Sequence, residues 1–357
     1  MAETMAHNSL TSLASLAATL ASAAPKWQSI DHWPAESLMA CGDFGVIRGL
    51  AGLAGWSPVQ QIETLITLAE ADLVTTFIIT QHLGALKRLV ASSQVDAHQS
   101  LVSQLADGRQ TASVGISHLT TSRRHLDRPV VSATRCKQGY VLDGMIPWVT
   151  GASRVDWIVV GASLDDGSQV LALVKAKTAG VNPGPGAKMI AMESSCTDSV
   201  KLEGVFVDDR FIIAGPTEEV LSAKSDATKK TGGAGGLQTS ALALGLSFAA
   251  LEYLKFEATN RTNLRAIAER FDQEHFAVRS RLLSATNSES DIDLSELRSQ
   301  ANSLVQRTTA AAMTTAKGAG LMANHPVARY CQQAFFFLVW SCPQPVAEAH
   351  LCEMAGL

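Results

Sequence analysis

The chain has 357 residues, of which 46% are hydrophobic and 17% are charged. A chain of this length and hydrophobicity can bury one large core or two to three ordinary ones, so global disorder is excluded. The net charge of −4 at pH 7 gives no electrostatic reason to bind a phosphate polymer, so we expect neither a nucleic-acid partner nor an acidic membrane surface.

The first predicted element spans residues 9–24, where leucines recur at helical spacing. The small residues at its end imitate a secretion signal, but Glu3 precedes it and no Lys or Arg occurs before Lys26. No window holds the 18 or so uninterrupted apolar residues of a membrane span. The six cysteines form no C-x-x-C pair and no zinc-ligand cluster, so we expect no metal, reduced thiols and a cytoplasmic protein.

Residues 57–90 carry apolar side chains at intervals of three and four, which predicts helix. Ser57 followed by Pro58 has the pattern of an N-cap with proline at the first helical position. We therefore expect an N-terminal helical domain over residues 1–106.

Residues 108–215 change to short β-rich runs that are separated by turn formers about every ten residues. This spacing is typical of an antiparallel sandwich or barrel, and it predicts a separate β domain over residues 107–215. A glycine-rich linker at 229–236 leads into further helical patterns, which predict a C-terminal helical bundle over residues 216–357. Its apolar run 334–340 is predicted to form an oligomer interface.

The segment 138–156 reads as a hairpin strand followed by Trp148 and Thr150 on one face of the next strand. An indole and a hydroxyl side by side can stack on a flat ring and donate a hydrogen bond to it. The alternative is structural: a tryptophan buried in the sandwich core beside a solvent-exposed threonine.

This segment resembles the β domain of the acyl-CoA dehydrogenase family, because Gly139-Tyr140, Asp143-Gly144, Trp148-Val149-Thr150 and Asp156 occupy the positions of a family motif. In that family the Trp and the Thr lie against the flavin ring of FAD, so the resemblance implies this role for Trp148 and Thr150. The run 112–118 aligns loosely with another FAD-contacting strand of the family, which implies that Ser117 also contacts FAD.

The helical half carries two further matches. The residues from Gly245 to Arg261 keep a family spacing, and by resemblance Arg261 binds the FAD pyrophosphate of a neighbouring subunit, which implies a homodimer or homotetramer. Gly318 and Gly320, followed by Pro326, match a glycine-rich family segment, and such glycines permit a close approach to phosphate or adenine. The structural alternatives are a solvated arginine and a helix C-cap at Gly318.

The catalytic base of the family is absent. The match puts Ser341 at the usual glutamate, and a serine hydroxyl cannot act as that base unaided. A minority of family members place the glutamate at a position that here is Gly235, and the serine that contacts the CoA arm falls within 121–123. Other candidate bases are His118, Glu252 and His325.

We therefore expect an α+β protein of the acyl-CoA dehydrogenase fold, with an N-terminal helical domain, a central antiparallel β domain and a C-terminal bundle resembling a four-helix bundle. The resemblance implies an FAD-dependent oxidoreductase of fatty acid metabolism, which transfers hydride to flavin from a small-molecule substrate such as an acyl-CoA. Two alternatives stay open. One is a flavin-dependent monooxygenase on the same fold, which takes reduced flavin from a partner reductase, and the other is a non-catalytic flavin-binding subunit.

Overall fold

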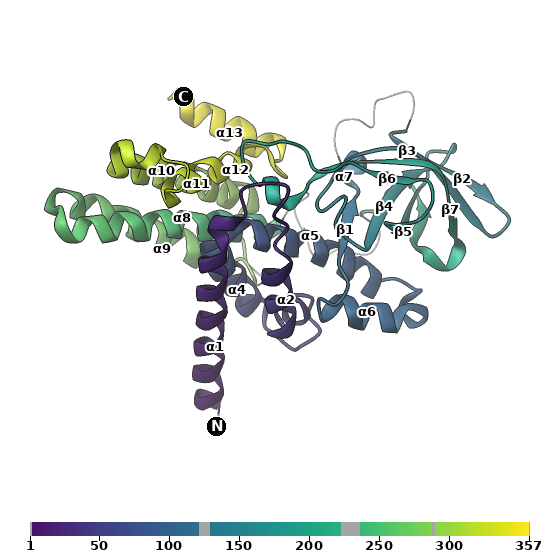
Figure 1. Ribbon diagram of the computed structural model, residues 1–357, viewed down its shortest axis with the longest axis horizontal. Helices are drawn as coiled ribbons and strands as arrows, with labels where there is room; N and C mark the ends of the chain where they lie inside the picture. The colour runs from purple at the N-terminus through teal and green to yellow at the C-terminus, as the bar shows by residue number, and fades with distance from the viewer. Residues whose placement is uncertain (1, 121–128, 223–235, 288–289, 357) are drawn as a thin grey trace.

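The computed structural model describes residues 2–120, 129–222, 236–287 and 290–356. Figure 1 shows a sheet at one side of the molecule and helices at the other, with the N-terminal helices packed between and below them. The predicted linker at 229–236 lies outside the described residues, except for Gly236. The N-terminal helices are α1 (Ala2–Ala23), α2 (Ala35–Asp43), α3 (Val46–Leu50), α4 (Pro58–Ala71), α5 (Leu73–Val90) and α6 (Gln99–Ala106).

Local sequence determines where α4 and α5 begin. The Ser57 hydroxyl accepts a hydrogen bond from the Gln60 backbone N–H, while the Gln60 side chain accepts one from the Ser57 N–H. This reciprocal pair is a capping box. The predicted helix 57–90 is divided at Asp72, whose carboxylate accepts hydrogen bonds from the Val74 and Thr75 backbone N–H groups and so starts α5.

The middle of the chain forms an eight-stranded sheet in the order β6-β7-β3-β2-β4-β5-β8, with β1 paired to β4. Most pairs are antiparallel, as expected, but β1 and β2 both pair with β4 in parallel, so the sheet is mixed and the expected antiparallel domain is corrected to that extent. The β2–β3 hairpin lies between β1 and β4 in the sequence. After this hairpin the chain enters β4 in the same direction as β1, so the two strands pair in parallel. The strands are β1 (Ala112–Gly115), β2 (Val131–Cys136), β3 (Gly139–Val149), β4 (Trp157–Ser163), β5 (Gln169–Lys175), β6 (Val181–Pro183), β7 (Asp198–Asp208) and β8 (Ile212–Thr217).

The short helix α7 (Ser117–Thr120) follows β1, and the remaining helices form the C-terminal bundle. Its central helix, α8, is long and apolar enough to cross a membrane, but 72% of its apolar window is buried inside the protein, as in the core helix of a folded domain. The bundle consists of α8 (Gly236–Asn260), α9 (Arg265–Ser284), α10 (Leu294–Ala316), α11 (Pro326–Ala334), α12 (Phe336–Val339) and α13 (Gln344–Ala355).

The two helical segments share one hydrophobic core. A cluster of buried side chains includes residues of α4 and α5, of α8 and α10, and the sheet residues Val159 and Leu171. A second cluster lies within the sheet. At Gly245 a Cβ atom would lie 2.5 Å from the Ile66 carbonyl oxygen, so α4 and α8 touch backbone to backbone. The division of the chain into three domains at 106 and 215 stays a prediction.

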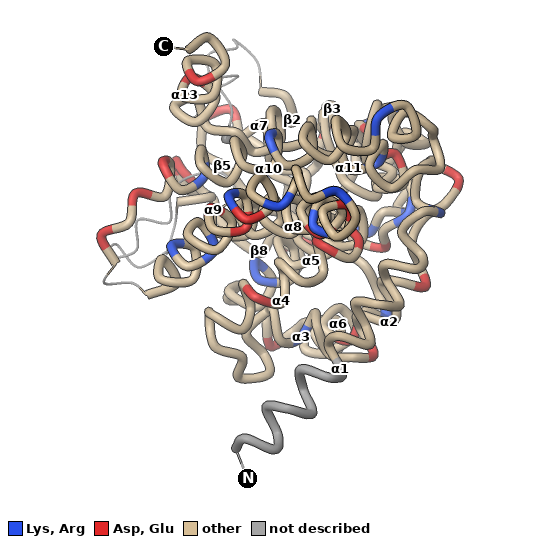
Figure 2. The backbone as a smooth tube through the Cα atoms, turned by 90° about the vertical axis from the view of Figure 1, so that its left-hand side faces the viewer, with Lys and Arg blue, Asp and Glu red and all other residues tan. Residues whose placement is uncertain are grey.

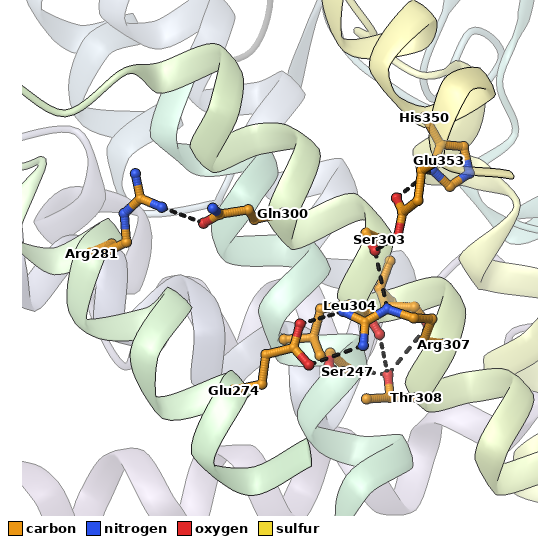
Figure 3. A network of polar contacts seen from close by, with 11 residues as sticks. Ser247, Glu274, Arg281, Gln300, Ser303, Leu304, Arg307, Thr308, His350 and Glu353 are labelled. Carbon is orange, nitrogen blue, oxygen red and sulfur yellow. Dashed lines mark hydrogen bonds and ion pairs between the residues drawn. The ribbon is translucent and has the colours of Figure 1, made fainter. Parts of the chain in front are cut away.

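Polar contacts join α9, α10 and α13 of the bundle (Figure 3). Arg307 of α10 pairs with both carboxylate oxygens of Glu274 on α9, and its Nε donates to the Ser303 hydroxyl at 3.1 Å. The Ser303 hydroxyl in turn donates to Glu353 of α13 at 2.5 Å. Basic and acidic residues are interspersed over this side of the molecule (Figure 2), in keeping with the small net charge.

Candidate functional site

Trp148 and Thr150 lie at the end of β3. The Trp148 side chain is 54% exposed, whereas Thr150, directly after the strand, is only 6% exposed. This is the reverse of the structural alternative, which requires a buried tryptophan and an exposed threonine. The pairing of β3 with β7 shifts between Ile146 and Val149, and this irregularity interrupts the simple alternation of side chains.

The Thr150 hydroxyl is held by a second hydroxyl that the sequence did not point out. Thr197 Oγ1 donates to Thr150 Oγ1 at 3.2 Å, and Ser195 Oγ lies 2.8 Å from Thr197 Oγ1. Both residues belong to a hydroxyl-rich run, Ser194 to Ser199, just before and within the start of β7. That run was the available signal, but a strand that pairs with β3 had to be known before its hydroxyls could be assigned to Thr150.

Ser117 is brought to the same end of the sheet. It opens α7 one residue after Ile116, which follows β1. A Cβ atom at Gly115 would lie 2.9 Å from Ile146 and 3.2 Å from Val149, so the end of β1 packs directly on the end of β3. Ser117 and the Trp148–Thr150 pair therefore belong to one region.

The candidate base His118 is a buried residue next to Ser117. Its Nε2 lies 2.9 Å from the Gly161 carbonyl oxygen of β4, which ties the ring to the sheet backbone. The predicted CoA-contacting serine within 121–123 and the alternative base position Gly235 lie outside the described residues.

Arg261 and the two glycines come together at the other end of the molecule. Arg261 directly follows α8, and its Nη2 donates to the Glu257 carboxylate and, at 3.0 Å, to the Thr315 carbonyl oxygen near the end of α10. Its Nε is buried and has no hydrogen-bond partner among the described residues. Gly318 lies just beyond α10 with open space around its Cβ position, whereas a Cβ at Gly320 would meet the Met313 sulfur at 2.7 Å.

These two groups of residues do not meet within one chain. Among the described residues, no hydrogen bond or ion pair joins Arg261 to Trp148 or Thr150. In Figure 1 the outer ends of α8 and α10 lie on the left, while β3 belongs to the sheet on the right.

Ser341 lies in the turn between α12 and α13, with a left-handed φ of 46°. A ladder of side chains on α10, spaced four residues apart, supports the chain before it. Arg298 Nη2 donates to the Trp340 carbonyl oxygen at 3.3 Å, Asn302 Nδ2 to the Phe337 oxygen at 3.0 Å, and Gln306 Nε2 to the Ala334 oxygen at 2.6 Å.

The arginine of this ladder is the charged group next to Ser341. Arg298 is only 5% exposed and forms no ion pair with a carboxylate among the described residues. Burial lowers the pKa of its guanidinium to about 10, partly offset by the nearby Cys342. Ser341, the predicted position of the absent base, therefore directly follows a backbone carbonyl that binds a buried cation.

The apolar run 334–340 packs mostly inside its own chain. Phe337 is fully buried, Trp340 stacks on Phe336 with centroids 4.7 Å apart, and Trp340 meets Phe77 of α5 edge-on at 5.0 Å. Only Phe335 and Val339 present large exposed surfaces. The whole run is therefore not available as an oligomer interface, although these two side chains are.

The remaining base candidates lie among the helices. Glu252 of α8 pairs with Lys255 at 3.1 Å. His325 caps α11, because its Nδ1 accepts a hydrogen bond from the Val327 N–H at 3.3 Å, and its ring meets the ring of Tyr253 edge-on.

His325 also lines a cavity of about 290 Å³ between α1, α4 and α11, together with Glu70 and Arg329. Burial and the neighbouring charge of Glu252 raise the pKa of Glu70 to about 7. Within the described residues, no group of three or more His, Cys, Asp or Glu side chains could hold a metal ion.

No family model matches the chain, and no curated protein matches it. Several solved structures match the chain. A glutaryl-coenzyme A dehydrogenase in complex with glutaryl-CoA is 14% identical with a TM-score of 0.82, and the match covers 98% of this chain and 95% of that one. Butyryl-CoA dehydrogenase from Megasphaera elsdenii is 16% identical (TM-score 0.80, covering 98% and 97%), and dibenzothiophene monooxygenase from Paenibacillus sp. A11-2 is 17% identical (TM-score 0.77, covering 98% and 97%). These likenesses confirm the predicted fold.

Proposed function

We propose that this chain, which has the acyl-CoA dehydrogenase fold, binds FAD and acts as an oxidoreductase on a small organic substrate. The observation that carries the proposal is the inverted exposure at the end of β3, where a tryptophan faces solvent and a threonine hydroxyl is buried. An exposed indole beside a buried hydroxyl offers a flat ring both a surface to stack on and a hydrogen-bond donor. The fold itself is compatible with several reactions.

The described residues fit FAD at both ends of the cofactor. Trp148 offers an aromatic surface for the ring, and Thr150 offers a hydroxyl donor beside it. Arg261 has a buried Nε without a partner, which suits a pyrophosphate oxygen, because buried guanidinium groups bind such anions through paired N–H donors. When bound, FAD would supply the redox chemistry, and the chain would hold and orient it.

The separation of these two groups supports an assembly of identical chains. We propose that Arg261, Gly318 and Gly320 contact FAD held by the Trp148 and Thr150 of a second copy, in a homodimer or homotetramer. The electrons would be exchanged with a separate flavin carrier or electron-transfer partner.

The reaction class depends on Ser341. Removing the α-proton of a thioester needs a base near neutral pKa, and Ser341 has only a hydroxyl with the Arg298 cation behind it. We therefore propose that the chain handles common straight-chain acyl-CoAs slowly or not at all. The missing carboxylate favours a second candidate function, a flavin-dependent monooxygenase, and one of the similar structures is a monooxygenase.

Anaerobic mixing of the FAD-loaded protein with a panel of acyl-CoAs separates these functions. Bleaching of the flavin absorbance supports dehydrogenation. No bleaching, together with consumption of oxygen and modification of an added substrate after reduced flavin is supplied, supports the monooxygenase. Stable FAD binding without either reaction supports a non-catalytic subunit, and a folded protein that binds no flavin at high micromolar concentration contradicts the whole proposal.

Ser341→Glu is the constructive variant. If the region around Ser341 admits a thioester, the new carboxylate should create or raise dehydrogenase activity, because a general base contributes about 10²–10⁴-fold. Ser341→Ala is the matched control and should change little. Robust wild-type turnover that Ser341→Ala leaves intact would show that another residue is the base.

A further inference from the structure

We infer that Ser195 and Thr197 are positioning residues that fix the direction of the Thr150 hydroxyl, so that its proton points to the flavin ring. This inference rests on the proposed function, because it needs a flavin beside Thr150. We refer to Ser195, Thr197 and Thr150 as the hydroxyl chain.

Counting protons gives the hydroxyl chain a direction. Each hydroxyl has one proton to donate and two lone pairs to accept with. Thr197 donates its proton to Thr150, so the 2.8 Å contact with Ser195 must be one in which Ser195 donates to Thr197. The Thr150 proton is then left over, and no acceptor for it exists among the described residues. An external acceptor beside Thr150 completes the hydroxyl chain.

The direction of these hydrogen bonds has an energetic effect because the hydroxyls are buried. Ser195 is fully buried and Thr150 nearly so, which leaves little room for water to exchange with either hydroxyl. Hydrogen bonds in such a site polarise one another, so Thr150 becomes a stronger donor when it also accepts from Thr197. A buried donor without an acceptor costs free energy, which favours occupation of the site by a group that carries one.

The turn that carries Ser195 is held in an unfavourable conformation. Met192 and Cys196, on either side of the short turn Glu193–Ser195, both have left-handed φ values, 64° and 45°. Left-handed φ values are unfavourable for residues other than glycine and persist only where surrounding contacts impose them.

Those contacts hold the turn from two sides. The Gly151 N–H donates to the Ser195 carbonyl oxygen at 2.8 Å, directly after Thr150 in the chain. On the far side of the turn, the Ser194 hydroxyl donates to the Ser29 carbonyl oxygen at 2.8 Å. The turn is thereby fixed to the β3 end, as a support for the Thr150 hydroxyl requires.

The experiment measures the reduction potential of the bound flavin in variants of the full chain. A hydrogen bond donated to the ring interacts unequally with its oxidised and reduced forms, so it contributes to the potential. Thr197→Val keeps the shape but removes the donor, so at a fixed potential the ratio of reduced to oxidised flavin should change about three- to tenfold, the range of one neutral hydrogen bond. Ser195→Ala should shift it in the same direction by less, and Thr197→Ser should restore the wild-type value.

A double-mutant cycle separates positioning from a direct or structural effect. If Thr197 acts through Thr150, then Thr197→Val should shift the potential in the wild-type background and leave it unchanged in the Thr150→Val background. Ser199→Ala is the matched control, because that hydroxyl contacts Asp198 and lies outside the hydroxyl chain. It should leave the potential unchanged.

Two results overturn the inference. One is an unchanged potential in Thr197→Val protein that is folded and binds flavin. The other is a shift of equal size in both backgrounds. If Thr197→Val does not fold, Ser195→Ala with and without Thr150→Val gives the same test. A wild-type protein that is folded and binds no flavin instead contradicts the proposed function, so the two failures are distinguishable.

Discussion

At the scale of single residues, the proposed role of Arg261 in flavin binding conflicts with a contact that this side chain already makes. Its guanidinium is already paired with Glu257, one helical turn earlier on α8, and the pairing places a negative charge where the flavin pyrophosphate would bind. Glu257 should therefore weaken flavin binding, both by occupying Arg261 and by repelling the phosphates.

This competition gives opposite predictions for two neighbouring residues. Arg261→Ala should weaken flavin binding by about 1.5–3 kcal/mol, the range of a hydrogen bond to a charged group. Glu257→Gln should strengthen it severalfold. Fluorescence titration with FAD measures both, with Glu296→Gln as the control, because that carboxylate pairs with Arg281 on an exposed face. Weaker binding in Glu257→Gln would show that the carboxylate orients Arg261 and does not compete for it.

Glu70 makes stability depend on pH in an unusual direction. Its pKa is raised from 4.5 to about 7, so between these pH values the folded chain keeps a proton that the unfolded chain has released. The free energy of unfolding therefore falls as the pH rises from 4.5 to 7, and the loss is complete above pH 7.

Glu70→Gln removes this titration. Because the carboxyl is partly exposed and screened by solvent, we expect a gain of only about 1–2 kcal/mol in the free energy of unfolding at pH 8, and almost none near pH 4.5. Urea unfolding at the two pH values measures it. The exposed Glu36→Gln on α2 is the control and should change stability by less than about 0.5 kcal/mol at either pH. An equal gain at both pH values would assign the effect to packing.

The residues of the site differ in how far sequence could locate them. The expected turn at Asp143-Gly144 was wrong, because β3 runs without a break from Gly139 to Val149. Trp148 and Thr150 were still predictable as near neighbours at its end. Thr197 was not, because its hydroxyl reaches Thr150 only through the pairing of β3 with β7, some fifty residues apart. The roles of Ser117, Trp148, Thr150, Arg261, Gly318, Gly320 and Ser341 stay predictions.

At the scale of elements, the contact between α4 and α8 leaves no room for a side chain at Gly245. At Gly245 a Cβ atom would lie 2.5 Å from the Ile66 carbonyl oxygen and 2.7 Å from the Ala69 Cβ. Neither atom is the end of a flexible side chain, so the helices themselves would have to move apart.

Gly245→Ala should therefore destabilise the protein by about 1–3 kcal/mol or more, despite the better helix propensity of alanine. The midpoint of urea unfolding measures the change. Gly318→Ala is the stability control, since nothing lies within 4 Å of its Cβ position, and it should leave the midpoint close to wild type. A wild-type midpoint for Gly245→Ala would mean that α4 and α8 lie farther apart than described.

The elements themselves were largely predictable where local chemistry decides them. The capping box at Ser57 starts α4 as the sequence indicates. The end of α4 at Asp72 was missed, because the apolar periodicity continues through it. Asp72 can be recognised as an N-cap only when the start of α5 at Leu73 is known. The parallel pairing of β1 with β4 was also missed, since it depends on where a distant hairpin places the chain.

At the scale of the whole molecule, the proposed assembly needs an apolar surface close to Arg261. Phe256 provides one, because it is a large exposed side chain on α8 little more than one turn before Arg261. Exposed aromatic residues next to a site that a second copy would complete are typical of an interface.

Phe256→Asp should therefore lower the oligomeric state and the flavin affinity together. Light scattering measures the mass, and a fluorescence titration with FAD measures the affinity. Phe206→Asp, at an exposed position of β7, is the control for an added charge and should affect neither. A wild-type protein that is a 37.8 kDa monomer at micromolar concentration would remove the proposed role of Arg261 in a neighbouring site.

The backbone contact between Ile66 and Gly245 also has a consequence for how the chain is made. During synthesis, α4 leaves the ribosome about 180 residues before the glycine against which it packs. At about 5–20 residues per second, its apolar face stays uncovered for roughly 10–35 s. An N-terminal fragment that ends before α8 leaves this face of α4 uncovered, so we expect it to aggregate when expressed alone.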